Sequence, residues 1–179
     1  MKLFGYHFIF KNLKNKDILI FDESNFQYLL NLFPSEKTYF IYRVREVYFY
    51  INIAIFYCFI KSLFLANWKD FSWGEGFRYI VREMFCYYHM ACIKTINPKI
   101  IITFTDNSFY YHWLVKNYKG IKFLAIQNGN RTTEQLNNIT KFNHQHFFCF
   151  GEYEVKRYKK FGHQIRFPHP IGSLKNDYF

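Results

Sequence analysis

The chain has 179 residues, a formal net charge of +11 and an aromatic content of 24%. This length accommodates one domain with a sizeable hydrophobic core, and it excludes two complete Rossmann-type domains. The charge suits anionic lipid or a phosphorylated substrate, but no nucleic-acid-binding motif accompanies it, so nucleic acid is not an expected partner. The cysteines at positions 58, 86, 92 and 149 lack metal-site spacing, and neither a metal nor a cofactor is predicted.

The chain opens with the pattern of a strand, a turn and a helix. Asp17–Phe21 is a compact apolar run that predicts a strand, and Asp22–Asn25 offers several N-cap residues. A helix is then expected over Phe26–Phe33, ended by Pro34, and Thr38–Tyr42 predicts a second strand. This opening places Asp22, Glu23 and Ser24 at the end of a strand.

The segment Val47–Ala66 is apolar for twenty residues, with few polar interruptions. Three interpretations stay open: a transmembrane helix, a helix lying in a membrane surface, or a buried strand over Tyr48–Ile53 followed by a core helix to Leu65. The N-terminus lacks a long apolar signal region, so export is not expected. The expected location is the cytoplasm, with the inner face of the membrane as an alternative.

The second half of the chain alternates apolar runs with helical patterns. Runs of this length, each followed by small or polar residues, are typical of buried parallel strands. We therefore predict an α/β fold, with a Rossmann-like parallel sheet flanked by helices. The predicted strands are Ile100–Asp106, Lys122–Gln127 and His146–Phe150, the predicted helices are Phe77–Ile96, Phe109–Tyr118 and Tyr153–Phe161, and Thr132–Asn143 is predicted to be a loop.

Asp106, Asn107 and Ser108 follow the first of these strands and open a helix. An N-cap accounts for at least one of them. A carboxylate at a strand end could equally orient or deprotonate a substrate hydroxyl, which makes Asp106 the candidate catalytic residue and its two neighbours candidate binding residues. Ligands of parallel sheets bind beyond the carboxyl ends of the strands, so this position suits a site.

The strongest local motif is the run Gln127, Asn128, Gly129, Asn130 and Arg131. Asn-Gly is a turn dipeptide, so a hairpin is the simplest explanation. No matching strand returns after it, however, and the run continues through two threonines to Glu134. Backbone N–H groups, amides and a guanidinium in one loop suit a sugar or a phosphate, so all six residues are candidate substrate-binding residues.

Two further strand ends carry glycine. Gly151 and Glu152 follow HFFCF, where the glycine permits close approach of a ligand and the glutamate favours a helix start. Gly172 and Ser173 follow His169-Pro170-Ile171 in a pattern typical of a strand leading into a linker. These four residues complete the candidate substrate-binding set.

Taken in order, IIITFTDNS, FLAIQNGNR, FFCFGEYE and PIGS resemble a family of bacterial surface carbohydrate biosynthesis proteins. That family is related to the polyglycerol-phosphate and capsule transferases, whose GT-B fold places two Rossmann-like domains across a cleft. The resemblance is best from about Lys99 to Ser173. It implies a transferase that moves a sugar or polyol phosphate from a nucleotide-activated donor to a glycan or lipid-linked acceptor.

The resemblance also implies an organisation. Residues 1–170 would form the acceptor-side domain, and residues 171–179 would begin the linker to a donor-binding domain that these residues do not include. The alternatives are a truncated reading frame, a split enzyme that needs a second chain, a degenerate remnant of such an enzyme and a non-catalytic binding module. Related transferases carry a histidine base where this chain has Asn128, so the base would be Asp106, Glu134 or Glu23. Replacing Asp106 or Arg131 is then expected to abolish transfer with the fold intact.

Overall fold

The computed structural model describes residues 2–3, 6–30, 39–44, 48–66, 77–138 and 141–173. The chain divides into two compact units, which we describe separately. The three-stranded unit comprises Met1–Asn15 and Arg45–Pro98, and the six-stranded unit comprises Lys16–Val44 and Lys99–Phe179. The first unit is therefore interleaved with the second in sequence. The assignment of residues 1–170 to one domain stays a prediction.

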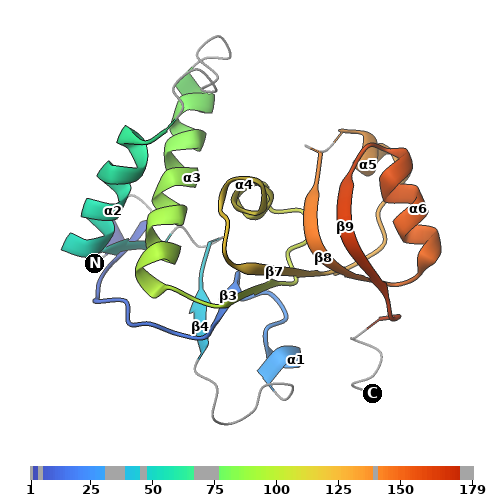
Figure 1. Ribbon diagram of the computed structural model, residues 1–179, viewed down its shortest axis with the longest axis horizontal. Coiled ribbons are helices and arrows are strands. Elements are labelled where there is room, and N and C mark those ends of the chain that lie inside the picture. The colour runs from blue at the N-terminus through green and yellow to red at the C-terminus, as the bar shows by residue number, and fades with distance from the viewer. Residues whose placement is uncertain are drawn as a thin grey trace. The chain divides into compact units, whose positions relative to one another are not determined.

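The three-stranded unit combines a small sheet with two helices. Strand β1 (Lys2–Leu3) pairs antiparallel with β2 (Tyr6–Phe10), which pairs parallel with β5 (Tyr48–Ile51). The helices α2 (Ile53–Phe64) and α3 (Phe77–Ile96) pack side by side (Figure 1). The predicted order of a strand followed by a helix over residues 48–65 is confirmed, but the prediction of a core helix is wrong, because only Ile55 and Ser62 of α2 are buried. In the described part of the chain, no helix combines the length and apolarity needed to cross a membrane.

Polar contacts fix these helices to the small sheet. The backbone N–H of Tyr50 donates to the Tyr88 hydroxyl at 2.6 Å, and that hydroxyl donates back to the Tyr50 carbonyl at 3.2 Å. Asn52 caps α2 by accepting from the Ile55 N–H at 2.7 Å, and its amide donates to the Lys11 carbonyl at 3.0 Å. The same asparagine thus ends β5, begins α2 and holds the segment after β2.

The six-stranded unit is built on a parallel sheet with the strand order β4-β3-β6-β7-β8-β9. Every neighbouring pair is parallel. The fold is therefore the Rossmann-like α/β arrangement that the sequence predicts. The strands are β3 (Ile18–Phe21), β4 (Tyr39–Tyr42), β6 (Ile100–Thr103), β7 (Lys122–Ile126), β8 (Asn143–Cys149) and β9 (Gln164–Pro170).

Helices cover both faces of this sheet. The helices are α1 (Gln27–Leu30), α4 (Phe109–Asn117), α5 (Thr133–Asn138) and α6 (Glu152–Lys160). Figure 1 shows α1 and α4 on opposite sides of the sheet. On one face, Leu29 of α1 packs in a cluster with Ile18, Ile102 and Ile126. Tyr111 of α4 contacts Phe123 on the other face, with ring centroids 5.8 Å apart.

This change of face follows from the chain path. From β3 the chain moves outward to β4, and it then returns to the other side of β3, where β6 to β9 follow in order. Since crossovers between parallel strands are right-handed, the two directions of travel place their helices on opposite faces. The topological switch point of the sheet therefore lies between β3 and β6.

One predicted element is wrong. The sequence predicts a loop over 132–143, but the structure has helix α5 there, and β8 already begins at Asn143. The helix start is stabilised by a reciprocal pair of hydrogen bonds: the Thr132 N–H donates to Gln135 Oε1 at 3.0 Å, and the Gln135 N–H donates to Thr132 Oγ1 at 3.2 Å. Leu136 is fully buried. The capping box formed by Thr132 and Gln135, together with one buried apolar residue, is therefore enough to form a helix in a polar segment.

Candidate functional site

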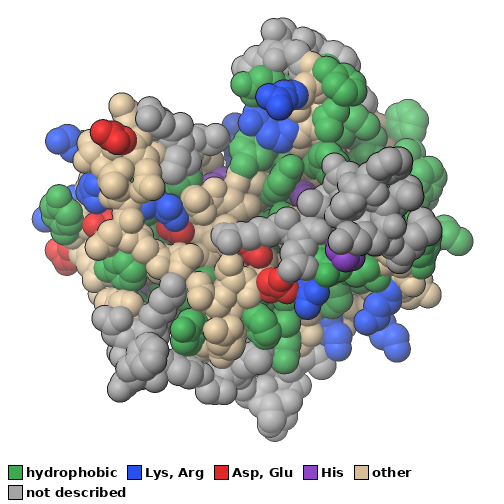
Figure 2. All heavy atoms as spheres, turned by 180° about the vertical axis from the view of Figure 1, so that it is seen from behind, with side chains coloured by type: hydrophobic (Ala, Val, Ile, Leu, Met, Phe, Trp, Pro, Cys, Tyr) green, Lys and Arg blue, Asp and Glu red, His purple; other side chains and the backbone are tan. Residues whose placement is uncertain are grey.

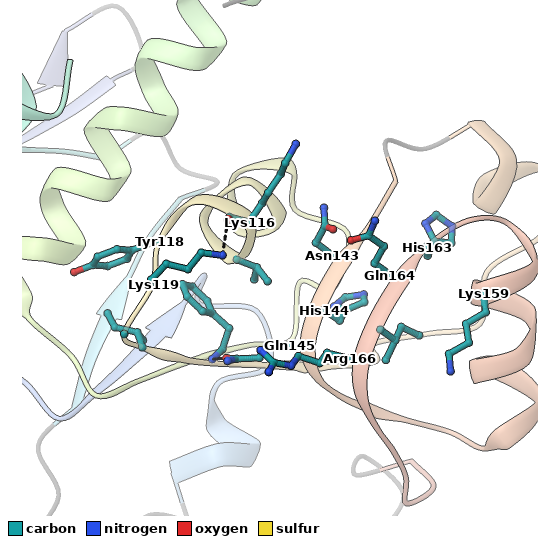
Figure 3. Close-up of a pocket in the computed structure, with 15 residues that line it drawn as sticks. Lys116, Tyr118, Lys119, Asn143, His144, Gln145, Lys159, His163, Gln164 and Arg166 are labelled. Carbon is teal, nitrogen blue, oxygen red and sulfur yellow. Dashed lines mark hydrogen bonds between the residues drawn. The ribbon is translucent and has the colours of Figure 1, made fainter. Parts of the chain in front are cut away.

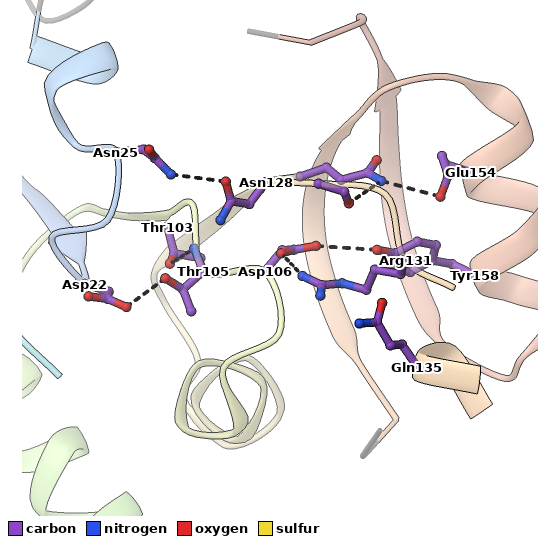
Figure 4. A network of polar contacts seen from close by, with 12 residues as sticks. Asp22, Asn25, Thr103, Thr105, Asp106, Asn128, Arg131, Gln135, Glu154 and Tyr158 are labelled. Atoms are coloured by element: carbon purple, nitrogen blue, oxygen red, sulfur yellow. Dashed lines mark hydrogen bonds and ion pairs between the residues drawn. The ribbon is translucent and has the colours of Figure 1, made fainter. Parts of the chain in front are cut away.

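The candidate site lies along the carboxyl edge of the six-stranded sheet. Because the strands are parallel, the loops that follow β3, β6, β7 and β8 all emerge at this edge. Figure 4 shows their polar side chains joined by hydrogen bonds and ion pairs. We call this set of loops and their side chains the strand-end network. It brings together Asp106, the loop of residues 127–131 and the start of α6, as the sequence predicts.

The network begins at the switch point. Thr105 Oγ1 donates to Asp22 Oδ2 at 2.7 Å, which ties the loop after β6 to the loop after β3. Asn25 Nδ2 donates to Asn128 Oδ1 at 3.1 Å, so the loop after β7 is held to the same segment. Asp22, at 2% exposure, is buried. These bonds connect residues that are 83 and 103 positions apart in sequence.

Backbone conformation also marks this loop. Asp22 has φ of 77° and Asn25 has φ of 57°, both in the left-handed region that non-glycine residues seldom adopt. Such conformations cost free energy and persist only where the surroundings impose them. Here Asp22 is held by Thr105 through its side chain and by the Tyr42 carbonyl through its N–H, at 2.8 Å.

Asp106 forms the buried centre of the network. Its carboxyl group is fully buried, forms an ion pair with Arg131 and accepts a long hydrogen bond of 3.4 Å from the Tyr158 hydroxyl. Burial raises the pKa of Asp106, while Arg131 and Tyr158 counteract part of that rise. Burial alone would lower the pKa of Arg131, but the interactions with Asp106 and Tyr158 together have the larger effect, so the pKa of Arg131 is raised. The guanidinium therefore stays charged.

His112 supports this centre from α4. One ring nitrogen lies 3.0 Å from the Asp106 carbonyl, and the other lies 3.0 Å from the Asn143 carbonyl and 3.2 Å from the Asn143 backbone nitrogen. Burial lowers the pKa of His112 to about 4, so the ring is neutral at physiological pH. It is a buried helix residue, and it fixes the backbone that carries Asp106.

Gln127 joins the loop after β7 to the loop after β8. Its Oε1 accepts from the Phe150 N–H at 3.1 Å, and its Nε2 donates to Glu154 Oε2 at 3.4 Å and to the Gly129 carbonyl at 3.2 Å. Glu154 also faces Arg157, with Oε1 and Nη1 3.7 Å apart. Gln127 is therefore a buried residue whose hydrogen bonds fix the conformation of the Asn128–Arg131 loop.

Two glycines of the network are not explained by the fold. Neither Gly129 nor Gly151 has φ in the left-handed region, and a Cβ added at either would meet no atom within 4 Å. Neither conformation nor packing therefore requires glycine at these positions. Open space above a strand-end glycine is what a ligand approaching the backbone would need.

The remaining predicted residues lie at the margin of the network. Asn107, Glu134 and Glu152 are exposed, and none of them forms a contact with the network within the described residues. Ser108 is the N-cap of α4 and accepts from the Tyr111 N–H at 3.4 Å. Gly172 and Ser173 follow β9, whose end is joined to β8 by the Ile171 N–H donating to the Cys149 carbonyl at 3.1 Å.

Sequence reasoning did not identify several members of the network. Thr105, Tyr158, Glu154 and Asn25 have no motif of their own, and Asp22 was visible only as a polar residue at a strand end. The position of a polar residue directly after an apolar run is the one sequence feature that indicates such residues, because that position lies at the carboxyl edge of the sheet.

The network can position hydroxyl and phosphate groups with amides, backbone N–H groups and one guanidinium. Within the described residues, no group of three His, Cys, Asp or Glu side chains could hold a metal ion. Comparison with protein-family models, curated proteins and solved structures found no match to this chain.

Proposed function

We propose that this chain carries the acceptor-side unit of a transferase that builds surface polysaccharide. In this proposal a sugar or polyol phosphate moves from a nucleotide-activated donor to a glycan or lipid-linked acceptor. A second Rossmann-like domain, in the same protein or in a partner chain, would hold the donor. The supporting observation is the strand-end network itself, where four loops are joined by polar contacts along the carboxyl edge of a parallel sheet, beginning at its switch point.

The proposed role of Asp106 depends on Arg131. A carboxylate held by a guanidinium is a weak base, because the ion pair favours its charged form. An incoming phosphate would compete for Arg131 and leave the carboxyl group buried with fewer opposing charges. Its pKa would then rise, and Asp106 could take the proton of an acceptor hydroxyl. The same phosphate would gain Arg131 as a stabilising cation.

A first test is binding of sn-glycerol 3-phosphate and N-acetylglucosamine 1-phosphate, measured by calorimetry. Gly129→Ala fits the open space above the loop and should change stability by less than about 0.5 kcal/mol, yet it should weaken binding at least about tenfold by obstructing the ligand. Asn137→Ala, at an exposed position on α5, is the matched control and should bind normally. Equal affinities for all three proteins would count against the site.

A non-catalytic binding module is the second candidate. It is favoured by the way acidic groups at this edge are paired with cations: Asp106 with Arg131, Glu154 with Arg157, and Glu23 with Arg43 at 2.7 Å. A transferase should release free nucleotide when donor and acceptor are both present, and Asp106→Asn should abolish that release. Saturable ligand binding with no turnover in any donor and partner combination would favour the binding module.

Contact with a membrane surface is part of the proposal. Ile53, Phe56, Tyr57 and Phe64 are exposed at helical spacing along one face of α2, and Lys61 shares that face. Figure 2 shows hydrophobic side chains gathered over this helix. α2 contains no acidic residue. An apolar, aromatic face with a cation suits the inner leaflet of a membrane, where a lipid-linked acceptor would lie.

Vesicle co-sedimentation tests this contact. Phe56 and Phe64 are 66% and 81% exposed, so replacing both with Ser should spare the fold and lower partitioning onto phosphatidylglycerol vesicles at least about tenfold. Tyr153→Ser is the control, because Tyr153 is 74% exposed but lies on α6 of the six-stranded unit. If the control loses as much binding as the double variant, α2 is not the attachment surface.

A further inference from the structure

A cavity lies at the edge of the six-stranded sheet opposite the strand-end network. It has a volume of about 680 Å³ and is bordered by the end of α4, the loop before β7 and the first residues of β8 and β9. The amino ends of the strands border it, whereas the strand-end network occupies their carboxyl ends. A cavity of this size accommodates a small organic ligand.

The charge of this cavity has one sign. Lys116, Lys119, Lys159 and Arg166 are among its lining residues, and none of the described lining residues is acidic. Figure 3 shows Lys116 and Lys119 on one side of the cavity and Lys159 on the other. Within the described part of the chain none of the four forms an ion pair. A concave surface with several unpaired cations concentrates anions.

A buried histidine lines the same cavity. His144 is only 3% exposed, and neither of its ring nitrogens has a hydrogen-bond partner within the described residues. Its ring stacks on Phe147 at 4.2 Å, so a phenylalanine would satisfy the packing equally well. A buried imidazole without partners is costly, and a ligand that formed hydrogen bonds with it would remove that cost.

The strand beneath the cavity is irregular. The ladder between β7 and β8 begins only at Leu124 and His146, because the Phe123 N–H bonds to the side-chain Oε1 of Gln145 at 2.6 Å. His144 and Phe147 are both buried although three positions separate them, so the usual alternation of faces is interrupted between them. This interruption places Gln145 and His144 together in the cavity lining.

We propose that this cavity binds a small phosphate-bearing molecule, with the four cations holding the phosphate groups and His144 completing its hydrogen bonds to the ligand. A hollow of this volume at the amino ends of three strands suits a small molecule better than a polymer, which would need an extended groove. The proposal is independent of the transferase proposal, since it rests on the other edge of the sheet. It assigns a second site, where a phosphate-bearing product or regulator would bind.

Calorimetry with uridine diphosphate, inorganic pyrophosphate and uridine tests the proposal. The two phosphate compounds should bind saturably and uridine should not. Lys159→Gln combined with Arg166→Gln should weaken binding at least about tenfold, because it removes half of the lining cations. Lys156→Gln combined with Lys160→Gln removes two exposed charges from the same helix outside the lining, and affinity should stay within about twofold.

His144→Phe provides a second readout that surface charge cannot mimic. It keeps the stack on Phe147 and should leave the fold intact while weakening phosphate binding about fivefold, the effect of one hydrogen bond. Gly129→Ala should leave this binding unchanged, which separates the two edges. Equal losses in the lining and control pairs, no saturable binding, or binding confined to long nucleic acids would each overturn the proposal.

Discussion

Replacing Arg131 with methionine should destabilise the six-stranded unit by about 3–5 kcal/mol at pH 7. The change removes the cation that neutralises a fully buried carboxylate and leaves, among the described side chains, the long 3.4 Å hydrogen bond from the Tyr158 hydroxyl. The loss should appear as a lower urea midpoint. Trp113 of α4 can report it by fluorescence, in a background where Trp68 and Trp73 are replaced by Phe.

A double-mutant cycle separates the ion pair from the rest of the change. Asp106→Leu combined with Arg131→Met removes both charges, so the double variant should be more stable than the sum of the two single losses predicts, by about 1–3 kcal/mol. Lys156→Met, an exposed change on α6, should stay within about 0.5 kcal/mol of the parent. A loss below about 1 kcal/mol for Arg131→Met would mean that the pair is not buried in solution.

Acidification should destabilise the same unit well above the pH at which exposed carboxylates titrate. His112, His144 and His163 pack around Phe142, and burial lowers the pKa of each. These histidines bind protons near pH 6.5 in the unfolded chain but only at lower pH in the folded chain. Their contribution to the free energy of unfolding is therefore fully present above pH 6.5, and it is lost as the pH falls toward their pKa values in the folded chain. For His112, with a folded pKa of about 4, the loss is about 3 kcal/mol.

Variants separate the buried histidines from other groups. Asp106 acts in the opposite direction, because its raised pKa favours the folded state as the pH falls. His144→Phe should therefore make the urea midpoint less dependent on pH between 7.5 and 4.5. His146→Gln is the control and should flatten this dependence less, because burial lowers the pKa of half-buried His146 but lowers the pKa of His144 well below its ordinary value. Equal flattening by both variants would contradict the assignment.

The sequence was sufficient to predict most of the six-stranded unit. Residues 100–102 and 123–126 are uninterrupted apolar runs followed by polar residues, a pattern imposed by burial on both faces of a parallel sheet. In the three-stranded unit, the helix Phe77–Ile96 also has the predicted bounds, and it ends where Asn97 adopts a left-handed conformation, with φ of 50°, directly before Pro98. Helix α5 was missed because one buried leucine gives no periodicity.

The candidate site was predictable only within each loop. The sequence places Asp106 and Arg131 at neighbouring strand ends, but their ion pair depends on the strand order. Tyr158 reaches Asp106 from a helix 52 positions away, and its aromatic ring reads as an ordinary core residue in sequence. Burial of the pair also changes the expectation for its variants, since a single replacement should affect stability as well as transfer.

The most direct test of the strand-end site is a nuclear magnetic resonance titration with sn-glycerol 3-phosphate and N-acetylglucosamine 1-phosphate. The measured signals are the glycine amide resonances of a ¹⁵N-labelled protein. The protein carries Lys159→Gln and Arg166→Gln, which weaken phosphate binding in the cavity at the opposite edge. Our account predicts saturable shifts for Gly129 and Gly151 at the carboxyl edge, and little change for Gly120, which lines that cavity. Unchanged Gly129 and Gly151 resonances at saturating concentrations of both compounds would contradict it.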